Sequence, residues 1–486
     1  MQIIDKPTTG FTGVGDVPTD ERGSDELWFL DMLEPRGAAP LARVTVVGCG
    51  HVGLVVAAGL AGLGHDVTGL DISEGLVKEL TTGQVRILEP SLTPLVRRGL
   101  DAGNLRFTTD YSGALDGAEF VFLAVDTPQT LAGAADMRNL RAASRQIASL
   151  LDGRNPIIVN KSTSPIGTGE TIEAIIGAFL QEDHAAPRIV SNPEFLQQGR
   201  AVEDFFRPDR IVVGARDPKD ARAVADLYAG LSGDVMVTDL RTSEMIKYVA
   251  NAFLATRVSF INEIARLCEQ IGVNVDRVVD GVALDERIGR HFFRAGIGYG
   301  GSCLPKDVAA LRYIGQIHGV STPVLSGVQE INNAQKAEAV SRIRRRLGTL
   351  DGQVIGVLGL TFKGATEDIR ESPAMDVVAL LRNEGASVHI FDPAVKPDRS
   401  DLPSGLRGTI TGSAIEAAAG ADALAILTDW AEFRDLPLAA IRSVMRGNVV
   451  FDGRNMLDIN AVEAEGFAYL GIGRIATKHR RRRSDA

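Results

Sequence analysis

The sequence predicts an α/β protein in which two doubly wound sheet domains are joined by a long helix and a helical connector. Three observations lead to this prediction. Short β-branched runs alternate with helical stretches in two separate parts of the chain, a long helical periodicity lies between them, and a glycine-rich turn follows the first run. The 486 residues are too many for one compact core, because a domain usually has about 150 residues.

The first sheet domain is predicted to span residues 41–238. Its short apolar runs are separated by helical stretches, which is typical of a parallel sheet with helices on both faces. We expect its strands at residues 44–47, 66–70, 119–125, 157–160, 188–191 and 211–213.

A single long helix is predicted to follow. Its apolar residues recur at steps of three, four and seven, which is the helical period, and a helix over residues 243–271 would be roughly 40 Å long. The residues that set this period are Ile246, Val249, Phe253, Phe260, Ile264, Leu267 and Ile271. The helical connector that contains it is expected to span residues 239–346.

A second sheet domain is predicted at residues 347–474. We expect its strands at residues 354–358, 387–391, 423–427 and 448–451. In both sheet domains the second strand is followed by an acidic residue, Asp71 or Asp392. Internal duplication and independent convergence on a strand-turn-helix unit both explain this likeness. Residues 1–40 are expected to form a flexible arm, and residues 475–486 a solvated basic tail.

Composition and charge exclude several classes of partner. A formal net charge of −10 disfavours nucleic acid and anionic membranes. The longest apolar run, residues 52–64, is shorter than the roughly 20 residues that span a bilayer, and the first 40 residues lack the pattern of a signal peptide. We therefore expect a cytoplasmic protein. The cysteines Cys49, Cys268 and Cys303 lack the spacing of zinc ligands, so no metal is expected.

A GxGxxG turn directly after the first predicted strand indicates a dinucleotide site in a Rossmann-like domain. The glycines Gly48, Gly50 and Gly53 let the backbone approach a pyrophosphate, and the N–H groups around Val52 at the start of the next helix would bind it. Asp71 ends the next predicted strand, where it can accept hydrogen bonds from an adenosine ribose and repel a 2′-phosphate. The sequence therefore predicts NAD rather than NADP as the cofactor.

Two polar clusters, residues 126–128 and 161–165, follow later strands of the same sheet. Because the carboxyl ends of parallel strands meet at one edge, the hydroxyls of Thr127 and Thr163 are expected to contact the nicotinamide end of the cofactor. Taken alone, each cluster is better explained as a plain turn.

The segment GGSCLPKD places Cys303 in a flexible glycine turn at the predicted start of a helix. Pro305 suits the first position of a helix, and the positive end of the helix dipole, with Lys306, would favour the thiolate. Asp307 lies one helical turn beyond Cys303, on the same side. The alternative is a buried cysteine in an ordinary turn.

Lys247 and Asn251 are four residues apart on the long predicted helix and lie off its apolar stripe. They are either a surface pair or, beside a thiol and a dinucleotide, a cation and an amide that stabilise a developing oxyanion.

These motifs belong to a set of segments whose order and combination are specific. The segments are VTVVGCGHVGL, NKSTSPIGT, SNPEFLQQGRAVEDFFRPDRIVVG, SEMIKYVANAFLATRVSFINEIARLC, LDERIGRHFFRAGIGYGGSCLPKDV, GLTFKGATEDIRESPA and FDGRN. Over about residues 41–474 they resemble the UDP-glucose/GDP-mannose 6-dehydrogenase family. The resemblance implies two Rossmann-like domains joined by a long central helix, which also forms the interface of a homodimer.

The resemblance further implies an NAD-dependent, four-electron oxidation of the C6 alcohol of a nucleotide sugar to a carboxylate, with UDP-glucose favoured. Cys303 would attack the C6 aldehyde, and the thiohemiacetal would be oxidised to a thioester and hydrolysed. The other residues that the resemblance assigns to the chemistry are Lys247 and Asn251 for the oxyanions, Asp307 for proton transfer, and Glu194 with Thr163 for the hydrolytic water.

Binding residues follow from the same resemblance. The additional cofactor residues would be Gln198, Lys306 and Arg370. The nucleotide sugar would be bound by Glu194, Phe195, Leu196, Lys247, Asn251, Tyr299, Gly300, Gly301, Ser302, Lys363 and Arg454, and by Arg287 from a neighbouring subunit.

Four features depart from the family pattern. Gln198 replaces a usual second glutamate, Asp126 a small residue and Leu76 a commonly basic residue, and residues 1–40 have no counterpart. Three other functions stay open. The first is the same reaction on GDP-mannose or a UDP-N-acetylhexosamine. The second is a two-electron hydroxyacid-type dehydrogenase, in which Cys303 would have no role. The third is a dinucleotide-binding regulator without turnover.

Overall fold

The structure is a computed structural model that describes residues 41–130, 132–180 and 185–475. Its contacts divide the chain into two units, Met1–Val249 and Ala250–Ala486, which are described in turn. The predicted N-terminal arm, and all but the first residue of the predicted basic tail, lie outside the described residues.

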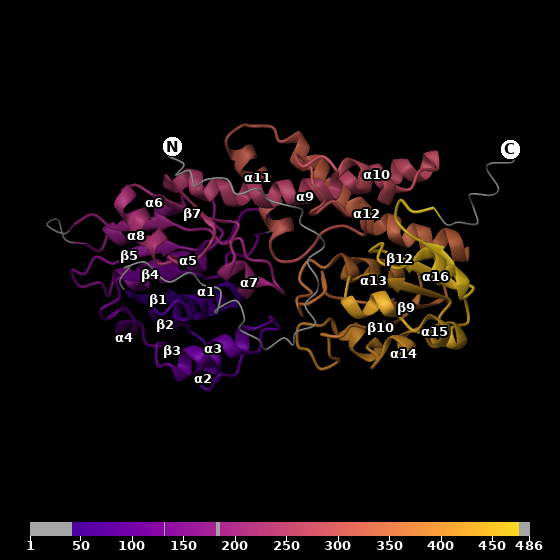
Figure 1. Ribbon diagram of the computed structural model, residues 1–486, viewed down its shortest axis with the longest axis horizontal. Coiled ribbons are helices and arrows are strands. Elements are labelled where there is room, and N and C mark those ends of the chain that lie inside the picture. The colour runs from indigo at the N-terminus through magenta and orange to yellow at the C-terminus, as the bar shows by residue number, and fades with distance from the viewer. Residues whose placement is uncertain (1–40, 131, 181–184, 476–486) are drawn as a thin grey trace. The chain divides into compact units, whose positions relative to one another are not determined.

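The first unit is built on an eight-stranded sheet in the order β3-β2-β1-β4-β5-β6-β7-β8 (Figure 1). The order reverses beside β1, so the sheet is doubly wound as predicted. The strands are β1 (Arg43–Val47), β2 (Asp66–Leu70), β3 (Leu105–Thr108), β4 (Phe120–Leu123), β5 (Ile157–Asn160), β6 (Arg188–Ser191), β7 (Arg210–Ala215) and β8 (Asp234–Thr238).

Helices cover both faces of this sheet. Val55, Leu95, Phe205 and Val224 pack into the core on one face, and Leu140 and Ile172 are among those that pack on the other. The helices are α1 (His51–Gly62), α2 (Glu74–Thr81), α3 (Leu92–Asp101), α4 (Tyr111–Leu115), α5 (Arg138–Ala148), α6 (Thr168–Gly177), α7 (Ala201–Phe206) and α8 (Pro218–Asp226).

The prediction of a wholly parallel sheet is wrong at one pair of strands. β6 and β7 are antiparallel, with Val190 opposite Ala215 and Ser191 opposite Gly214. Both strands are almost completely buried, so they give the same apolar run in either direction, and composition does not reveal the reversal. β3 and β8 were not predicted, because β3 alternates between buried and exposed residues and β8 is an exposed edge strand.

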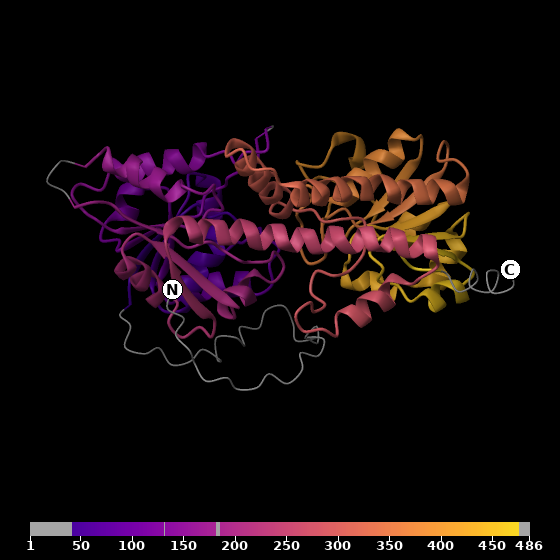
Figure 2. The same cartoon turned by 90° about the horizontal axis from the view of Figure 1, so that it is seen from above.

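Helix α9 (Leu240–Ile271) is one uninterrupted helix of 32 residues (Figure 2), about 48 Å long. The apolar stripe that sets its period is mostly exposed, since Val249, Phe253, Phe260, Leu267 and Ile271 are each at least 50% exposed. The buried face of α9 carries Tyr248 and Ile261 together with small residues such as Ala252, Ala255 and Ala265.

Within the described residues, the second unit contains the rest of α9, seven further α-helices and a five-stranded sheet. The sheet has the order β10-β9-β11-β12-β13, and all its pairings are parallel. The strands are β9 (Val354–Leu358), β10 (Ser387–Phe391), β11 (Ala423–Ile426), β12 (Val449–Asp452) and β13 (Ala468–Leu470), of which the short β13 was not predicted.

Helices also cover both faces of the second sheet. Ile261 of α9, Ile343 and Val377 pack into the core on one face, and Ala417, Ile441 and Val462 pack on the other. The helices are α10 (Val275–Val282), α11 (Leu304–Ile317), α12 (Pro323–Leu347), α13 (Pro373–Asn383), α14 (Ala414–Ala418), α15 (Leu438–Val444) and α16 (Ile459–Ala464), with the 3-10 helices η2 (Ser404–Thr409) and η3 (Ala431–Asp435). In the described ranges, no helix combines the length and the apolarity needed to cross a bilayer.

Candidate active site

The GxGxxG turn between β1 and α1 gives each glycine a different role. Gly48 has φ +93°, and a Cβ there would lie 2.7 Å from the carbonyl oxygen of Ala124. A Cβ on Gly53 would clash with the carbonyl oxygen of Gly48. Gly50, in contrast, has nothing within 4 Å of its Cβ position. The turn therefore leaves open space over Gly50, at the start of α1, where the first-turn N–H groups have no partner within the helix.

Replacing Gly53 with alanine is expected to weaken NAD binding at least about tenfold, because the new methyl group must displace the Gly48 carbonyl and open the turn. Isothermal titration with NADH measures the effect. Gly75→Ala is the matched control, since nothing lies within 4 Å of its Cβ position in α2 and alanine favours a helix. Equal NADH affinity in the two variants would contradict the role given to the turn.

Asp71 lies at the carboxyl end of β2, next to this turn. One oxygen accepts a hydrogen bond from Cys49 N at 2.8 Å and the other from Ser73 N at 2.9 Å. The residue is partly exposed, so the oxygens can still accept from a ribose. Ile72, which follows it, is 83% exposed.

The second sheet domain has a similar turn after β9, but there the acidic residue that follows the second strand is buried. Gly359 has φ +97° and donates to Phe391 O at 2.7 Å, as Gly48 donates to Leu70 O at 2.7 Å. Asp392, however, is only 4% exposed. Its Oδ2 accepts from Leu360 N, Thr361 N, Thr361 Oγ1 and Trp430 Nε1 at 2.7–3.2 Å. Protein donors therefore saturate Oδ2, and Oδ1 accepts from Ala394 N at 2.9 Å.

The two polar clusters at the strand ends of the first sheet meet as expected. Thr127 Oγ1 donates to Thr163 O at 2.6 Å, and Ser162 Oγ donates to Val125 O at 2.7 Å. Asp126 is exposed. The two loops are thus fixed to each other at the carboxyl edge of the sheet.

Glu194 and Lys247 form a buried ion pair. Their side chains are each 5% exposed, and Lys247 Nζ lies 2.9 Å from Glu194 Oε1. Glu194 Oε2 accepts from Leu196 N at 2.6 Å. Burial works against ionisation of Glu194, but the Lys247 ammonium and these hydrogen bonds hold the pKa of its carboxyl below the ordinary value. Glu194 is therefore a carboxylate at neutral pH.

A second buried lysine lies near this pair and has no role assigned from sequence. Lys161 Nζ donates to Asn192 Oδ1 at 2.9 Å and to Tyr228 Oη at 3.3 Å. Burial lowers the pKa of Lys161 to about 7. Asn192 lies two residues before Glu194, so this network supports the segment that carries Glu194.

Phe195 has cations against its ring. The Arg210 guanidinium lies 3.9 Å and Lys247 Nζ 5.4 Å from the ring centroid, which is the range of cation–π attraction. Leu196 and Gln198 follow and are both partly buried. Arg210 was missed from sequence, because its contact comes from a different strand.

Cys303 caps α11, the helix predicted to follow it. The backbone N–H of Asp307 donates to Cys303 O at 3.0 Å, and the Cys303 Sγ and Ser302 Oγ atoms lie 3.8 Å apart. Cys303 is partly exposed, whereas Cys49 and Cys268 are buried. The thiol is thus at the positive end of a helix and accessible.

Asp307 is placed by two predicted residues. It is 1% exposed, and its oxygens accept from Asn251 Nδ2 at 2.6 Å and from Lys306 Nζ at 2.6 Å. The structure therefore brings Asn251 of α9 and Asp307 of α11 together. Lys306, assigned to the cofactor, is paired with Asp307.

The loop before Cys303 is held by buried amides that the sequence did not reveal. Asn332 of α12 accepts from Tyr299 N at 2.8 Å and donates to Tyr299 O at 3.0 Å. A Cβ on Gly300 would clash with Glu371 O, and one on Gly301 would lie 2.7 Å from the ring of Phe362. Only glycines fit at these two positions.

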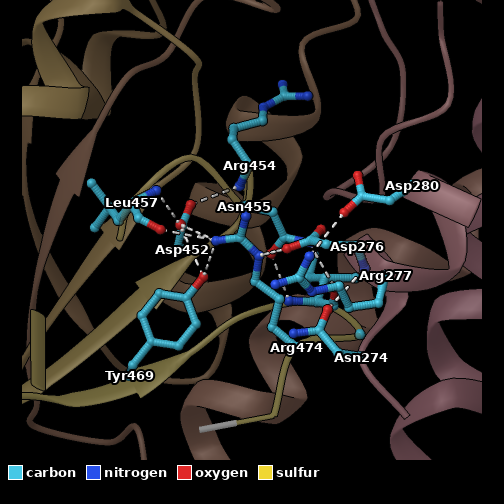
Figure 3. Close-up of polar contacts among 12 residues, drawn as sticks. Asn274, Asp276, Arg277, Asp280, Asp452, Arg454, Asn455, Leu457, Tyr469 and Arg474 are labelled. Atoms are coloured by element: carbon cyan, nitrogen blue, oxygen red, sulfur yellow. Dashed lines mark hydrogen bonds and ion pairs between the residues drawn. The ribbon is translucent and has the colours of Figure 1, made fainter. Parts of the chain in front are cut away.

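Arg454 donates its guanidinium hydrogen bonds to backbone carbonyls. Its guanidinium donates to Leu427 O at 2.7 Å, Phe362 O at 2.9 Å and Gly298 O at 3.2 Å. Figure 3 shows its side chain pointing away from the polar cluster of Asp452, Tyr469 and Arg474, which its neighbours form. Asp452 fixes the turn by accepting from Arg454 N at 3.2 Å. Arg454 therefore ties together the loops that carry Tyr299 and Lys363.

The remaining predicted residues lie at charged or aromatic contacts within the second unit. Arg370 pairs with Asp368 at 2.6 Å, the exposed Arg287 with Asp285 at 2.6 Å, and Lys363 Nζ lies 5.9 Å from the Phe362 ring centroid. Among the residues that the structure covers, no group of three His, Cys, Asp or Glu side chains is arranged to hold a metal.

The predicted residues thus form two groups, one in each unit. The first contains the 48–53 turn, Asp71, Thr127, Thr163, Glu194, Phe195, Leu196, Gln198 and Lys247. The second contains Asn251, Arg287, the 299–307 segment, Lys363, Arg370 and Arg454. Helix α9 carries a member of each, Lys247 and Asn251, one turn apart.

Comparisons with known proteins agree over most of the chain. Residues 42–232, 241–334 and 356–459 match the models for the NAD binding domain, central domain and UDP binding domain of the UDP-glucose/GDP-mannose dehydrogenase family. A UDP-glucose 6-dehydrogenase of Rhizobium meliloti (strain 1021) is 43% identical over 441 residues, which are 89% of this chain and 99% of that protein. The UDP-glucose 6-dehydrogenase TuaD of Bacillus subtilis (strain 168) is 38% identical over 445 residues, which are 90% of this chain and 94% of that protein. A solved UDP-glucose dehydrogenase from the archaeon Pyrobaculum islandicum has a TM-score of 0.83 and 37% identity, covering 91% of this chain and all of that one.

Proposed function

The chain belongs to the UDP-glucose/GDP-mannose dehydrogenase family, and on that premise we propose that it oxidises the C6 alcohol of UDP-glucose to the carboxylate of UDP-glucuronate, with NAD as the oxidant. The observation that carries this proposal is the accessible thiol of Cys303 at the start of α11, with the buried Asp307 one turn along the same helix. A two-electron dehydrogenase needs no such thiol.

The proposed reaction removes two hydrides from C6. NAD supplies the hydride acceptor, and it is used twice for each sugar. Cys303 Sγ adds to the carbonyl carbon of the C6 aldehyde, and the oxygen takes up a proton to give a thiohemiacetal. Loss of the second hydride and that proton leaves a thioester. Water then adds to the thioester carbon, the C–S bond breaks, and the thiolate and carboxylate are released.

Residues of α9 and α11 stabilise the negative charge that develops in these steps and transfer the protons. The C6 oxygen carries negative charge when its proton leaves and again during hydrolysis. The Lys247 ammonium and the Asn251 amide, one turn apart on α9, stabilise that charge. Asp307, held by Asn251 Nδ2 at 2.6 Å, accepts and returns protons. The Glu194 carboxylate, with Thr163, positions the hydrolytic water.

NAD and UDP-glucose are proposed to bind to two sets of residues. The residues proposed to bind NAD are Gly48, Gly50, Val52, Gly53, Asp71, Thr127, Thr163, Gln198, Lys306 and Arg370. The residues proposed for the sugar nucleotide are Phe195, Leu196, the 299–302 segment, Lys363, Arg454 and Arg287 of a second copy. The match of residues 356–459 to a UDP binding domain supports the uridine end of this assignment.

A stoichiometric assay tests the proposed function. We expect two NADH to form per UDP-glucose, measured by absorbance with limiting sugar. One NADH per sugar would favour a two-electron dehydrogenase, and none would favour a regulator. GDP-mannose and UDP-N-acetylhexosamines in the same assay test the other substrates, and two NADH from one of them alone would reassign the substrate.

We propose that two copies of the chain associate through α9, as the exposed stripe of Phe253, Phe260 and Leu267 supports. Phe253→Asp is expected to halve the molar mass measured by light scattering, because it places a charge in the buried centre of the interface. Phe179→Asp is the matched control, since Phe179 is 50% exposed but lies outside α9. Unchanged mass in the Phe253 variant would rule out this interface.

We also propose a cytoplasmic location. It is supported by the three free cysteines of the described chain, of which the chemistry needs one as a thiol.

A further inference from the structure

One buried carboxylate joins the dinucleotide turn to the segment that carries Glu194. The side chain of Glu89 is completely buried. Its Oε2 accepts hydrogen bonds from His51 Nε2 and from Gly199 N, both at 2.8 Å. Its Oε1 accepts from Ala201 N at 2.7 Å. None of the steps above uses Glu89.

The donors belong to the starts of two helices. His51 is the first residue of α1 and directly follows the open space over Gly50. Ala201 is the first residue of α7. Neither helix is capped by the side chain of its own N-cap residue. Glu89 binds the first backbone N–H of α7 directly, and it meets α1 through the side chain of His51.

The two helices also pack tightly against each other. A Cβ on Gly59 of α1 would clash with the ring of Phe205, and one on Gly62 would lie 3.0 Å from the ring of Phe206. In a close-packed interior, a displacement of one helix also displaces the helix packed against it. A shift at the start of α1 is therefore expected to reach the start of α7.

The segment before α7 is the one assigned to the sugar. It runs from Glu194, paired with Lys247, to Gly199, where φ is +83°. Glu89 fixes its far end at Gly199 and Ala201. The same side chain thus holds a residue of the dinucleotide turn and the end of the sugar-binding segment.

We propose that Glu89 is a positioning residue that couples NAD binding at the 48–53 turn to UDP-glucose binding at the 194–199 segment. A pyrophosphate at the start of α1 fixes the position of His51. Glu89, which is hydrogen-bonded to His51, then fixes the position of Gly199. Each ligand then tightens the binding of the other by the same factor, because coupling between two sites is reciprocal. We expect a factor of about five or more. The inference rests on the proposed function, which places the two ligands at these segments.

Isothermal titration of UDP-glucose with and without saturating NADH measures this factor without turnover. Glu89→Gln turns an amide N–H₂ group toward N–H donors, and the factor is expected to fall to one while both ligands still bind. His51→Phe removes only the α1 side of the bridge and is expected to have the same effect with the α7 contacts intact. It keeps the test decisive if the Glu89 variant does not fold.

Asp220→Asn is the matched control. Asp220 is a buried carboxylate of the same unit, 8% exposed, but it binds Arg188 and contacts neither segment. It is expected to keep the factor. An unchanged factor in His51→Phe, or no coupling in the unsubstituted protein, would overturn the inference. Failure of the proposed function is distinguishable, because the unsubstituted protein would then neither bind UDP-glucose nor form NADH.

Discussion

Cys303→Ser is expected to abolish formation of the uronate, with a loss of at least about a thousandfold. The serine hydroxyl keeps the place at the start of α11 but is a far weaker nucleophile than a thiolate. At most the first oxidation then proceeds, so limiting UDP-glucose yields no more than one NADH, and free aldehyde collects in solution. Absorbance counts the NADH, and mass spectrometry identifies the sugar product.

Mass spectrometry of the unsubstituted enzyme, quenched during turnover, is expected to show a sugar adduct on the peptide that contains Cys303. Cys268→Ser is the matched control, because Cys268 is buried in the core of the second unit and is expected to be needed only for packing. Full uronate output from Cys303→Ser would contradict a thioester route.

Lys247→Met is expected to lower kcat about 10²–10³-fold, the usual cost of losing one oxyanion donor. It also removes the main cause that holds the pKa of Glu194 down. Burial then dominates, and the pKa of Glu194 rises. Because Glu194 acts as a carboxylate, the pH at which activity sets in is expected to move upward. A profile of kcat against pH, from about 5 to 9, measures this shift.

The double variant Lys247→Met/Glu194→Gln separates catalysis from stability. Lys247→Met alone leaves a buried carboxylate without its partner, which costs about 3–5 kcal/mol of folding free energy. Removing the charge on Glu194 as well is expected to restore most of the thermal stability but none of the rate. If the single variant keeps the acid limb of the unsubstituted enzyme, Lys247 does not control Glu194.

Much of the fold was predictable because buried parallel strands give continuous apolar runs. β2, β5, β6, β9 and β10 begin and end where the sequence places them. β3, β8 and β13 escaped prediction because they are short, exposed or alternating. The reversed direction of β7 escaped it because strand direction depends on the connection and not on composition.

The candidate site was predictable where a local motif carries it. The GxGxxG turn and the GGSCLPKD segment show their geometry within a few residues, so the starts of α1 and α11 follow from sequence. The contacts that support these segments could not be predicted from the sequence. Glu89 and Asn332 contact the site from far along the chain, as Trp430 contacts Asp392 at the turn after β9. The local sequence around each of these three residues contains no motif that predicts its hydrogen-bond partner.

The saturated carboxylate of Asp392 has a consequence for the order of events. Of the two similar turns, the one after β1 keeps its acid available to a ribose, and the one after β9 does not. We therefore expect a subunit to bind one NAD at a time, at the turn after β1. In the proposed reaction, NADH must then leave and a second NAD must bind while the sugar is still attached to Cys303, so we expect this exchange to set an upper limit on kcat.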